Sequence, residues 1–493
     1  MLTDHSIAAL EFTTSDGVTI SLDWHTRTTE PAPVVLHQTP YIKADLDDGS
    51  LPIPALIDSG YHVVTMDIRG TGASGGTFLG PVSPREVIDA TEIVEFLADH
   101  ELSNGKIALA GASYPGAIQF LVAAHRPRGL VCIMPGVAPI DAYRDWLRLG
   151  GIPQHSNWAA MTFLQQNNPA ASVKPALDRF YGEILSQTED GPIFREFSPI
   201  EVLNRIVAPV LLIGGVHDYF RRGTYRAYDE LTAPKRMVLG PWGHGYPSDP
   251  SELITWLDYW TRGIGDDPTS GESIRLWDIA GARWSYAAAT DAMAEWRTVP
   301  LADNDVVVPV TATKRGWPDG PPSPIDWREE TATHSGMHLW GTSVRQELAE
   351  VDADLVTGGV ILDLDLTLEG CVDADLYARL SLIDDAGIEQ QLTEGRLRLS
   401  HHTIDAELSA VDSDGGYIRI GHTHVAPEPL GDGVATRVLI ELLPTCTSIP
   451  KDWRLAIGFS ACRADGGTRA GRITLSRGTR VRLPLARGTE AAP

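Results

Sequence analysis

The order of the apolar segments constrains this chain more than any other feature of its sequence. In the first half, short β-branched runs such as Val34-Val35-Leu36 and His62-Val63-Val64-Thr65-Met66 alternate with segments of helical periodicity. Runs of this kind are typical of strands buried within a parallel sheet. Their alternation with helices predicts a doubly wound α/β sheet.

The pattern changes after Gly263, where leucines begin to alternate strictly with polar residues, as in Leu362, Leu364, Leu366 and Leu368. A period of two with Asp/Gly turns predicts an antiparallel β-sandwich. Within the first pattern, a segment rich in Trp, Tyr, Gln, Asn and Pro breaks the alternation, and we interpret it as a helical cap. The predicted domains are an α/β domain (1–136 and 206–265), the cap (137–205) and a sandwich (270–493). A chain of 493 residues is too long for one core of ordinary size.

Composition excludes several classes of function. The formal net charge of −25 argues against binding to nucleic acid or to anionic membranes. The N-terminal residues lack a basic and then apolar signal pattern, and no run reaches the roughly 18 apolar residues that a membrane span needs. We therefore expect a cytoplasmic protein with a small-molecule substrate, and leave open whether it forms a homo-oligomer.

No metal or organic cofactor is expected. The four cysteines (Cys132, Cys371, Cys446 and Cys462) are scattered and are interpreted as small buried hydrophobic residues in a reducing compartment. Asp412-Ser413-Asp414-Gly415 faintly resembles a calcium loop but lacks the later glutamate, so a hairpin turn is predicted there.

The segment Gly111-Ala112-Ser113-Tyr114-Pro115-Gly116 carries the first chemical signal. It follows the predicted strand 106–110 and precedes a helical pattern, which is the context of a nucleophile elbow. Such a turn exposes a serine hydroxyl above the sheet, and the following helix directs its first N–H groups at the same place. The short pattern alone also fits an ordinary glycine-rich turn; the flanking strand and helix favour the elbow.

A serine nucleophile needs a base, and the base needs an orienting acid. Among the histidines that follow Ser113 before the sandwich (His125, His155, His217 and His244), only His244 follows a strand on a glycine-rich loop. Asp218 follows the preceding strand, which gives the chain order Ser, Asp, His of the α/β-hydrolase fold. The rival acids lie in the cap; they are Asp141, Asp145, Asp178, Glu183, Glu189 and Asp190. His217 is a neighbour that we interpret as a polar loop residue, with an alternative base or ligand as the other interpretation.

Five segments together resemble the cocaine esterase and X-Pro dipeptidyl-peptidase group, which also contains α-amino-acid ester hydrolases and glutaryl acylases. The segments are Pro40-Tyr41-Ile42-Lys43, residues 67–76, residues 111–116, residues 214–218 and residues 240–244. The resemblance implies a triad of Ser113, Asp218 and His244. It also implies a C-terminal jelly-roll domain, and an oxyanion hole formed by the Tyr41 hydroxyl and the Tyr114 backbone N–H.

Some positions depart from that pattern. Gln38-Thr39 stand where relatives often carry Arg-Asn, Ile42 replaces an acidic residue, and the cap is short. Substrates therefore cannot be transferred from the family. We expect hydrolysis of a carboxylic ester or amide through an acyl-enzyme, with acyl transfer or aminoacyl/X-Pro peptidase activity as the alternatives and a non-enzymatic binding protein as the remaining one. Aromatic side chains are predicted to line the pocket; they are Trp146, Trp158, Phe163 and Trp242.

Overall fold

The structure is a computed structural model in which the chain forms two compact units. The described residues are 6–44, 51–154, 164, 168, 171–245, 250–287, 295–311, 344–349, 351, 355–464, 467 and 469–486. Unit 1 comprises 1–147, 155–187 and 192–274, and unit 2 comprises 148–154, 188–191 and 275–493. The predicted cap segment 137–205 is thus divided between the two units.

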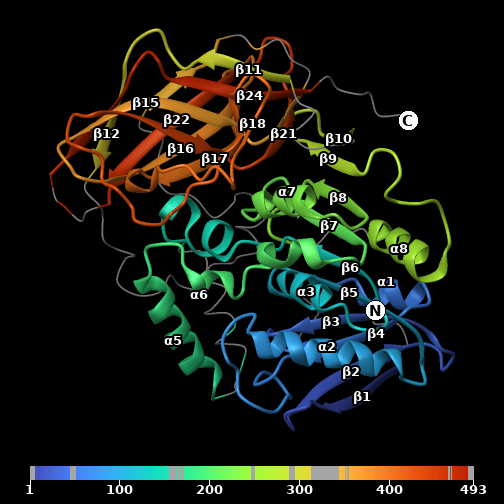
Figure 1. The fold of residues 1–493 in the computed structure, drawn as a ribbon. Helices are drawn as coiled ribbons and strands as arrows, with labels where there is room; N and C mark the ends of the chain where they lie inside the picture. The colour runs from blue at the N-terminus through green and yellow to red at the C-terminus, as the bar shows by residue number, and fades with distance from the viewer. Residues whose placement is uncertain are drawn as a thin grey trace. The chain divides into compact units, whose positions relative to one another are not determined.

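In the described part of unit 1, eight strands lie side by side in the order β1-β2-β4-β3-β5-β6-β7-β8 (Figure 1). They are β1 (Ser6–Thr13), β2 (Thr19–Thr26), β3 (Ala32–Thr39), β4 (His62–Asp67), β5 (Ser103–Ala112), β6 (Leu130–Gly136), β7 (Val210–Gly215) and β8 (Lys235–Gly240). From β4 to β8 every neighbouring pair is parallel. The predicted doubly wound sheet is therefore confirmed, and the carboxyl ends of its strands share one edge.

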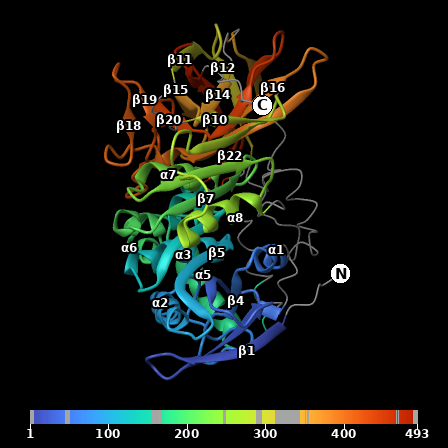
Figure 2. The same cartoon turned by 90° about the vertical axis from the view of Figure 1, so that its right-hand side faces the viewer.

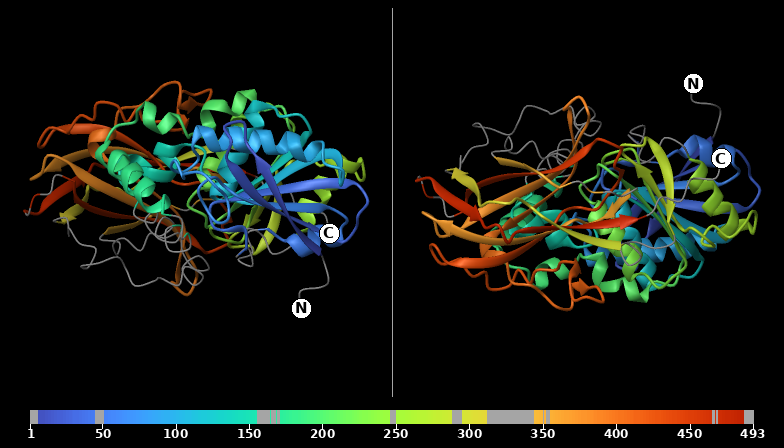
Figure 3. Two further views of the ribbon diagram at one scale, coloured as in Figure 1. Left: turned by 90° about the horizontal axis from the view of Figure 1, so that it is seen from below. Right: turned by 90° about the horizontal axis from the view of Figure 1, so that it is seen from above.

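The first two strands form a hairpin, which turns at Asp16-Gly17. The Thr14 N–H donates to the Val18 carbonyl (2.9 Å), and β1 pairs antiparallel with β2. From below, these dark blue strands are seen to fan across the rest of the sheet, as the twist of a β-sheet requires (Figure 3).

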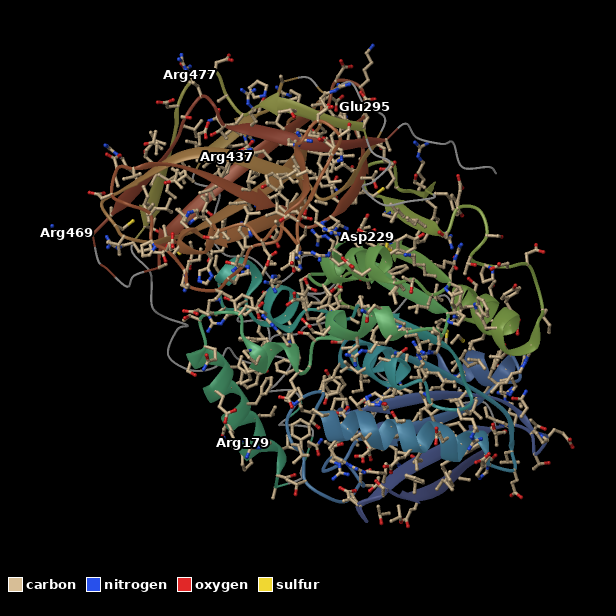
Figure 4. All side chains as sticks on the ribbon, in the orientation of Figure 1. Arg179, Asp229, Glu295, Arg437, Arg469 and Arg477 are labelled. Atoms are coloured by element: carbon tan, nitrogen blue, oxygen red, sulfur yellow. The ribbon has the colours of Figure 1, made fainter. Side chains whose placement is uncertain are left out.

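Helices follow the strands as the periodicity predicts. They are α1 (Ile53–Asp58), α2 (Pro84–Ala98), α3 (Tyr114–His125), α7 (Arg221–Glu230) and α8 (Ser251–Leu257). α2 and α3 cover one face of the sheet, while α1 and α8 lie on the other (Figure 2). Their polar faces carry exposed charges, such as Asp229 on α7 (Figure 4). Within the described segments, no helix has both the length and the apolarity to span a membrane.

The described part of the region between β6 and β7 contains helices of 3 to 14 residues. In unit 1 they are the π-helix η2 (Ala142–Leu147), α5 (Val173–Ser186), α6 (Pro192–Arg195) and the 3₁₀-helix η4 (Pro199–Arg205). The short 3₁₀ turn η3 (Leu149–Gly151) belongs to unit 2.

Unit 2 is the predicted all-β domain. Among its described residues, twelve strands share one network of ladders, and all pairs except β12 with β22 are antiparallel. They are β11 (Glu295–Pro300), β12 (Val306–Thr311), β13 (Val344–Glu347), β14 (Leu355–Gly358), β15 (Ile361–Glu369), β16 (Ala374–Ile383), β17 (Glu389–Arg398), β20 (Ala435–Glu441), β21 (Thr445–Ser448), β22 (Arg454–Arg463), β23 (Gly471–Leu475) and β24 (Arg480–Ala486).

The smaller elements of unit 2 are two strands near its start, one 3₁₀ turn and one two-stranded hairpin. β9 (Ile274–Asp278) and β10 (Arg283–Ala287) follow the end of unit 1, η7 (Leu399–His401) follows β17, and β18 (Ala410–Val411) pairs with β19 (Tyr417–Arg419). Asp412 to Gly415 form the turn between β18 and β19, as predicted. The alternating leucines of β15 are at most 1% exposed, so they form the core side of this strand.

The glycine-rich segment 67–76, which begins at the last residue of β4, is a tight structural loop. Arg69 forms ion pairs with the buried Asp89 of α2 (2.6 Å) and with Asp16 of the hairpin (3.0 Å). Gly70 has φ +71°, and a Cβ there would lie 2.0 Å from the backbone nitrogen of Phe78. This loop therefore depends on glycine for both conformation and space.

Two alanine substitutions separate those requirements. Gly17 also has a positive φ (+83°), but no atom lies within 4 Å of the place that a Cβ would take there. We predict that Gly17→Ala costs about 1–2 kcal/mol from backbone strain alone, and that Gly70→Ala costs about 1–3 kcal/mol more from the collision. Chemical denaturation of both variants measures the difference; equal losses would contradict the packing argument.

Candidate active site

Ser113 occupies a sharp turn between β5 and α3. Its backbone has φ 62° and ψ −120°, which is uncommon outside glycine. The neighbouring glycines make room for the turn: a Cβ at Gly111 would lie 2.6 Å from Pro115 Cβ, and one at Gly116 would lie 2.7 Å from the Gly136 carbonyl oxygen. The small residues of the motif are thus explained by close backbone approach.

His244 lies beside this serine on the loop after β8. Its Nε2 is 2.9 Å from Ser113 Oγ, and its Nδ1 is 2.9 Å from Asp218 Oδ1. The His244 side chain is 19% exposed, whereas Asp218 is fully buried. In the neutral tautomer that this arrangement favours, Nδ1–H donates to the carboxylate and Nε2 accepts the serine proton. The structure therefore brings the three predicted residues together in hydrogen-bonding order.

The loops that carry Asp218 and His244 are held together by their backbones. The His217 N–H donates to the Trp242 carbonyl (3.2 Å), and a Cβ at Gly215 would lie 2.0 Å from that same oxygen. Burial raises the pKa of Asp218, and its hydrogen bond with His244 acts in the opposite direction. This backbone contact therefore holds the loop of Asp218 and the loop of His244 next to each other.

The rival acids within unit 1 have other partners or lie on an exposed surface. Asp141 pairs with Arg144 (3.2 Å), Asp145 with Arg222, and Asp178 with Lys174 (2.7 Å) on α5. Glu183 is exposed on the same helix, and Glu189 and Asp190 belong to unit 2. Of the other histidines, His125 ends α3, His155 lies outside the described residues, and His217 contributes its backbone N–H to the loop contact.

The predicted oxyanion donors are neighbours. The rings of Tyr41 and Tyr114 meet edge to face, with centroids 6.4 Å apart. Tyr114 is the first residue of α3, where a backbone N–H has no partner within the helix. The proposed hydroxyl therefore comes from the loop after β3, and the proposed N–H comes from the first residue of α3.

The backbone around Tyr41 is fixed on both sides. Its own N–H donates to Thr39 Oγ1 (3.0 Å), and the Pro40 carbonyl accepts from Asn168 Nδ2 (3.0 Å). Ile42 has φ 73°, which is strained for a β-branched residue. The next N–H, that of Lys43, donates to Asp67 (2.7 Å), and this bond supports the strained conformation.

The predicted pocket residues have different surroundings. Trp146 is 7% exposed and packs against Phe180 and Phe197, with ring centroids 6.4 and 5.9 Å away. The Trp242 ring lies directly against Gly240, where a Cβ would be 1.9 Å from ring atoms. Trp158 and Phe163 lie outside the described residues. The pocket assignment therefore stays a prediction.

Three residues near the site were missed by sequence reasoning. The Tyr219 ring stacks on the His244 imidazole (4.6 Å, 25°), Asn168 holds the Tyr41 loop, and Glu86 accepts a hydrogen bond from the Tyr114 hydroxyl (2.7 Å). Tyr219 directly follows Asp218, so its position was a usable signal. Glu86 carried the signal of a helix cap, and Asn168 carried none.

In the described ranges, no group of three or more His, Cys, Asp or Glu side chains could hold a metal ion. The four cysteines are buried and unpaired with one another.

Comparison with known proteins places the chain. Residues 16–246 match the sequence profile of the X-Pro dipeptidyl-peptidase (S15) family, and residues 342–463 match the profile of the X-Pro dipeptidyl-peptidase C-terminal non-catalytic domain. The chain is 27% identical to cocaine esterase of a Rhodococcus strain. The match covers 46% of this chain and 47% of that esterase, so the chain spans about half the length of this relative. It is 22% identical to a Mycobacterium bovis protein assigned as a serine esterase, over 92% of this chain and 90% of that one.

Solved structures agree at the level of the fold. A hydrolase of the CocE/NonD family from Staphylococcus aureus superposes with a TM-score of 0.80 at 17% identity, covering 97% of this chain and 93% of that one. An α-amino acid ester hydrolase gives 0.75 at 14% identity, covering 98% and 97%. The predicted resemblance to the cocaine esterase and X-Pro dipeptidyl-peptidase group is therefore confirmed: both family profiles match in order, and the profiles and esterase relatives support a serine hydrolase.

Proposed function

We propose that the protein hydrolyses carboxylic esters through a covalent acyl-enzyme on Ser113. The observation that carries this proposal is the continuous pair of 2.9 Å contacts from Ser113 Oγ to His244 Nε2 and from His244 Nδ1 to Asp218. A nucleophile, a base and an orienting acid in this order support acyl transfer.

In the first step, Ser113 Oγ attacks the ester carbonyl carbon while its proton passes to His244 Nε2. The imidazolium that forms is stabilised by the buried Asp218 carboxylate. Collapse of the tetrahedral intermediate breaks the bond to the alcohol, which leaves with the proton from His244. Water, deprotonated by His244, then attacks the acyl-enzyme and releases the acid and Ser113.

The negative charge of each tetrahedral intermediate falls on the former carbonyl oxygen. We assign its stabilisation to the Tyr114 N–H and the Tyr41 hydroxyl, together with the amino-terminal end of α3. The fixed backbone on both sides of Tyr41 supports this role, because a preorganised donor costs no rearrangement during the reaction.

Ester hydrolysis is favoured over amide hydrolysis by the Mycobacterium bovis relative, which matches 92% of this chain and is assigned as a serine esterase. The S15 profile and a relative assigned as an Xaa-Pro dipeptidyl-peptidase in Bacillus cereus (22% identity, 42% of this chain) favour peptidase activity as the second candidate. Acyl transfer would use the same residues. Acyl-varied esters, X-Pro anilides and added alcohol or amine acceptors, with product analysis, separate the three.

The nucleophile is tested by covalent labelling. We predict that a fluorophosphonate probe labels the wild-type protein and that Ser113→Ala abolishes labelling while the circular dichroism spectrum is unchanged. Labelling of the mutant at the wild-type level would reject Ser113.

The base is tested by two histidine variants. His244→Ala should lower kcat at least about a thousandfold, because members of a triad act as a unit. His217→Ala should cost far less, since the group from His217 that holds the neighbouring loop is its backbone N–H. Steady-state kinetics on one ester checks both, and a reversed ranking would identify His217 as the base.

The oxyanion donor is tested by Tyr41→Phe, which removes only the hydroxyl. Loss of one such donor costs ~2.7–4 kcal/mol of transition-state stabilisation, or about a hundredfold or more in kcat. KM and melting temperature should change little. Near-normal turnover on a substrate whose chemical step is rate-limiting would make Tyr41 a structural residue.

A further inference from the structure

Glu86 is a buried carboxyl group to which the proposed mechanism gives no role. It is the third residue of α2, and its side chain is 1% exposed. The Ser83 hydroxyl accepts from the Glu86 N–H (3.4 Å), which is one half of a capping box. The Glu86 carboxyl would complete that box by turning back to Ser83, but it points into the protein instead and binds groups next to the active site.

Both carboxyl oxygens of Glu86 are engaged. Oε2 accepts from the Tyr114 hydroxyl (2.7 Å), and Oε1 accepts from Gln38 Nε2 (3.2 Å). The Tyr114 hydroxyl also accepts from the Val82 N–H (2.7 Å). The Tyr114 phenol is therefore occupied as donor and as acceptor, and it anchors the ring that follows the nucleophile.

The same carboxyl is connected to the other oxyanion donor. Gln38 lies on β3 three residues before Tyr41, and the Tyr41 ring contacts the Tyr114 ring edge to face. Glu86 thus binds one side chain from each of the two segments that carry the proposed donors.

This arrangement has a cost in stability. Burial, with the nearby Asp89 charge acting in the same direction, raises the pKa of Glu86 to about 8. The pKa of this carboxyl is therefore higher in the folded protein than its ordinary value of 4.5. For this reason the folded state loses stability as the pH rises from about 4.5 toward 8. A neutral side chain at position 86 would not carry this loss of folding stability. A contribution to stability alone therefore does not explain why a glutamate is buried here.

We infer that Glu86 is a positioning residue that fixes both donors of the oxyanion hole, through the Tyr114 phenol and the Gln38 amide. It does not touch the substrate; it holds the Tyr114 backbone N–H and the Tyr41 loop at the geometry that the oxyanion requires. This inference rests on the proposed function.

Tyr114→Phe is the principal test, because it keeps the ring and the backbone N–H and removes the hydroxyl with its bonds to Glu86 and to the Val82 N–H. We expect kcat to fall at least about tenfold with KM nearly unchanged, since small displacements of a preorganised group are costly. Tyr61→Phe is the matched control. It also removes a tyrosine–carboxyl hydrogen bond (to Asp258, 2.5 Å), but at the amino end of β4 and away from the site, so it should lower the melting temperature and leave kcat unchanged.

Two substitutions at position 86 extend the test. Glu86→Leu removes both acceptors and should lower kcat at least as much as Tyr114→Phe. Glu86→Gln keeps an acceptor for the Tyr114 hydroxyl, and the Gln38 amide can turn to bind the new amide. Its kcat should therefore be close to that of the wild type and well above that of Glu86→Leu. Its melting temperature at pH 8 should equal or exceed that of the wild type. If Glu86→Leu fails to fold, Tyr114→Phe decides alone.

A double variant separates this inference from the proposed function. Tyr114→Phe combined with Tyr41→Phe should lose less than the product of the two single losses, because the hydroxyl that Glu86 helps to place is already gone. Wild-type kcat in Tyr114→Phe would overturn the role of Glu86 while Tyr41 keeps its own, and fully multiplicative losses would overturn the part of that role that places the Tyr41 hydroxyl. Wild-type kcat in Tyr41→Phe would instead overturn the proposed oxyanion hole.

Discussion

The left-handed backbone of Ser113 is the constraint on which the rest of the site depends. A non-glycine residue in this region stores about 1–3 kcal/mol of strain, which the surrounding structure must hold. The Ser113 N–H donates to the Gly136 carbonyl of the neighbouring strand (2.8 Å). Behind the turn, the buried Gln119 amide donates to the Gly111 carbonyl (3.1 Å) and accepts from the Met134 N–H (3.0 Å). Backbone and side-chain bonds from β6 and α3 therefore keep the strained residue in place.

Much of unit 1 and the candidate triad could be predicted from the sequence, because both follow from simple geometry. Buried parallel strands have continuous apolar runs, and their carboxyl ends share an edge, so Asp218 and His244 could be chosen by their position after a strand. The same logic of alternating leucines predicts β15 and β16 of the all-β unit. These signals depend on patterns over several residues and not on the direction of one side chain.

The remaining features depend on side-chain direction or on irregular helices, for which the sequence has no clear period. The Ser83-to-Glu86 pattern fits both a complete capping box and a carboxyl turned inward, and only packing decides between them. Asn168 lies in the run Gln165-Gln166-Asn167-Asn168, where no residue is distinguished by pattern. The π-helix at Ala142–Leu147 is stabilised by the distant pair of Asp145 with Arg222, so local propensity does not predict it.

The close contact between Gly215 and the Trp242 carbonyl has a consequence for protein engineering. Because a side chain at 215 would occupy the place of a backbone atom in the loop of the base, a foreign acid loop fits this histidine loop only when it carries glycine at that position. A chimaera that moves specificity between family members should transfer the acid loop and the histidine loop as one cassette. Its junctions then belong before β7 and after the histidine loop, so that this backbone contact is inherited intact.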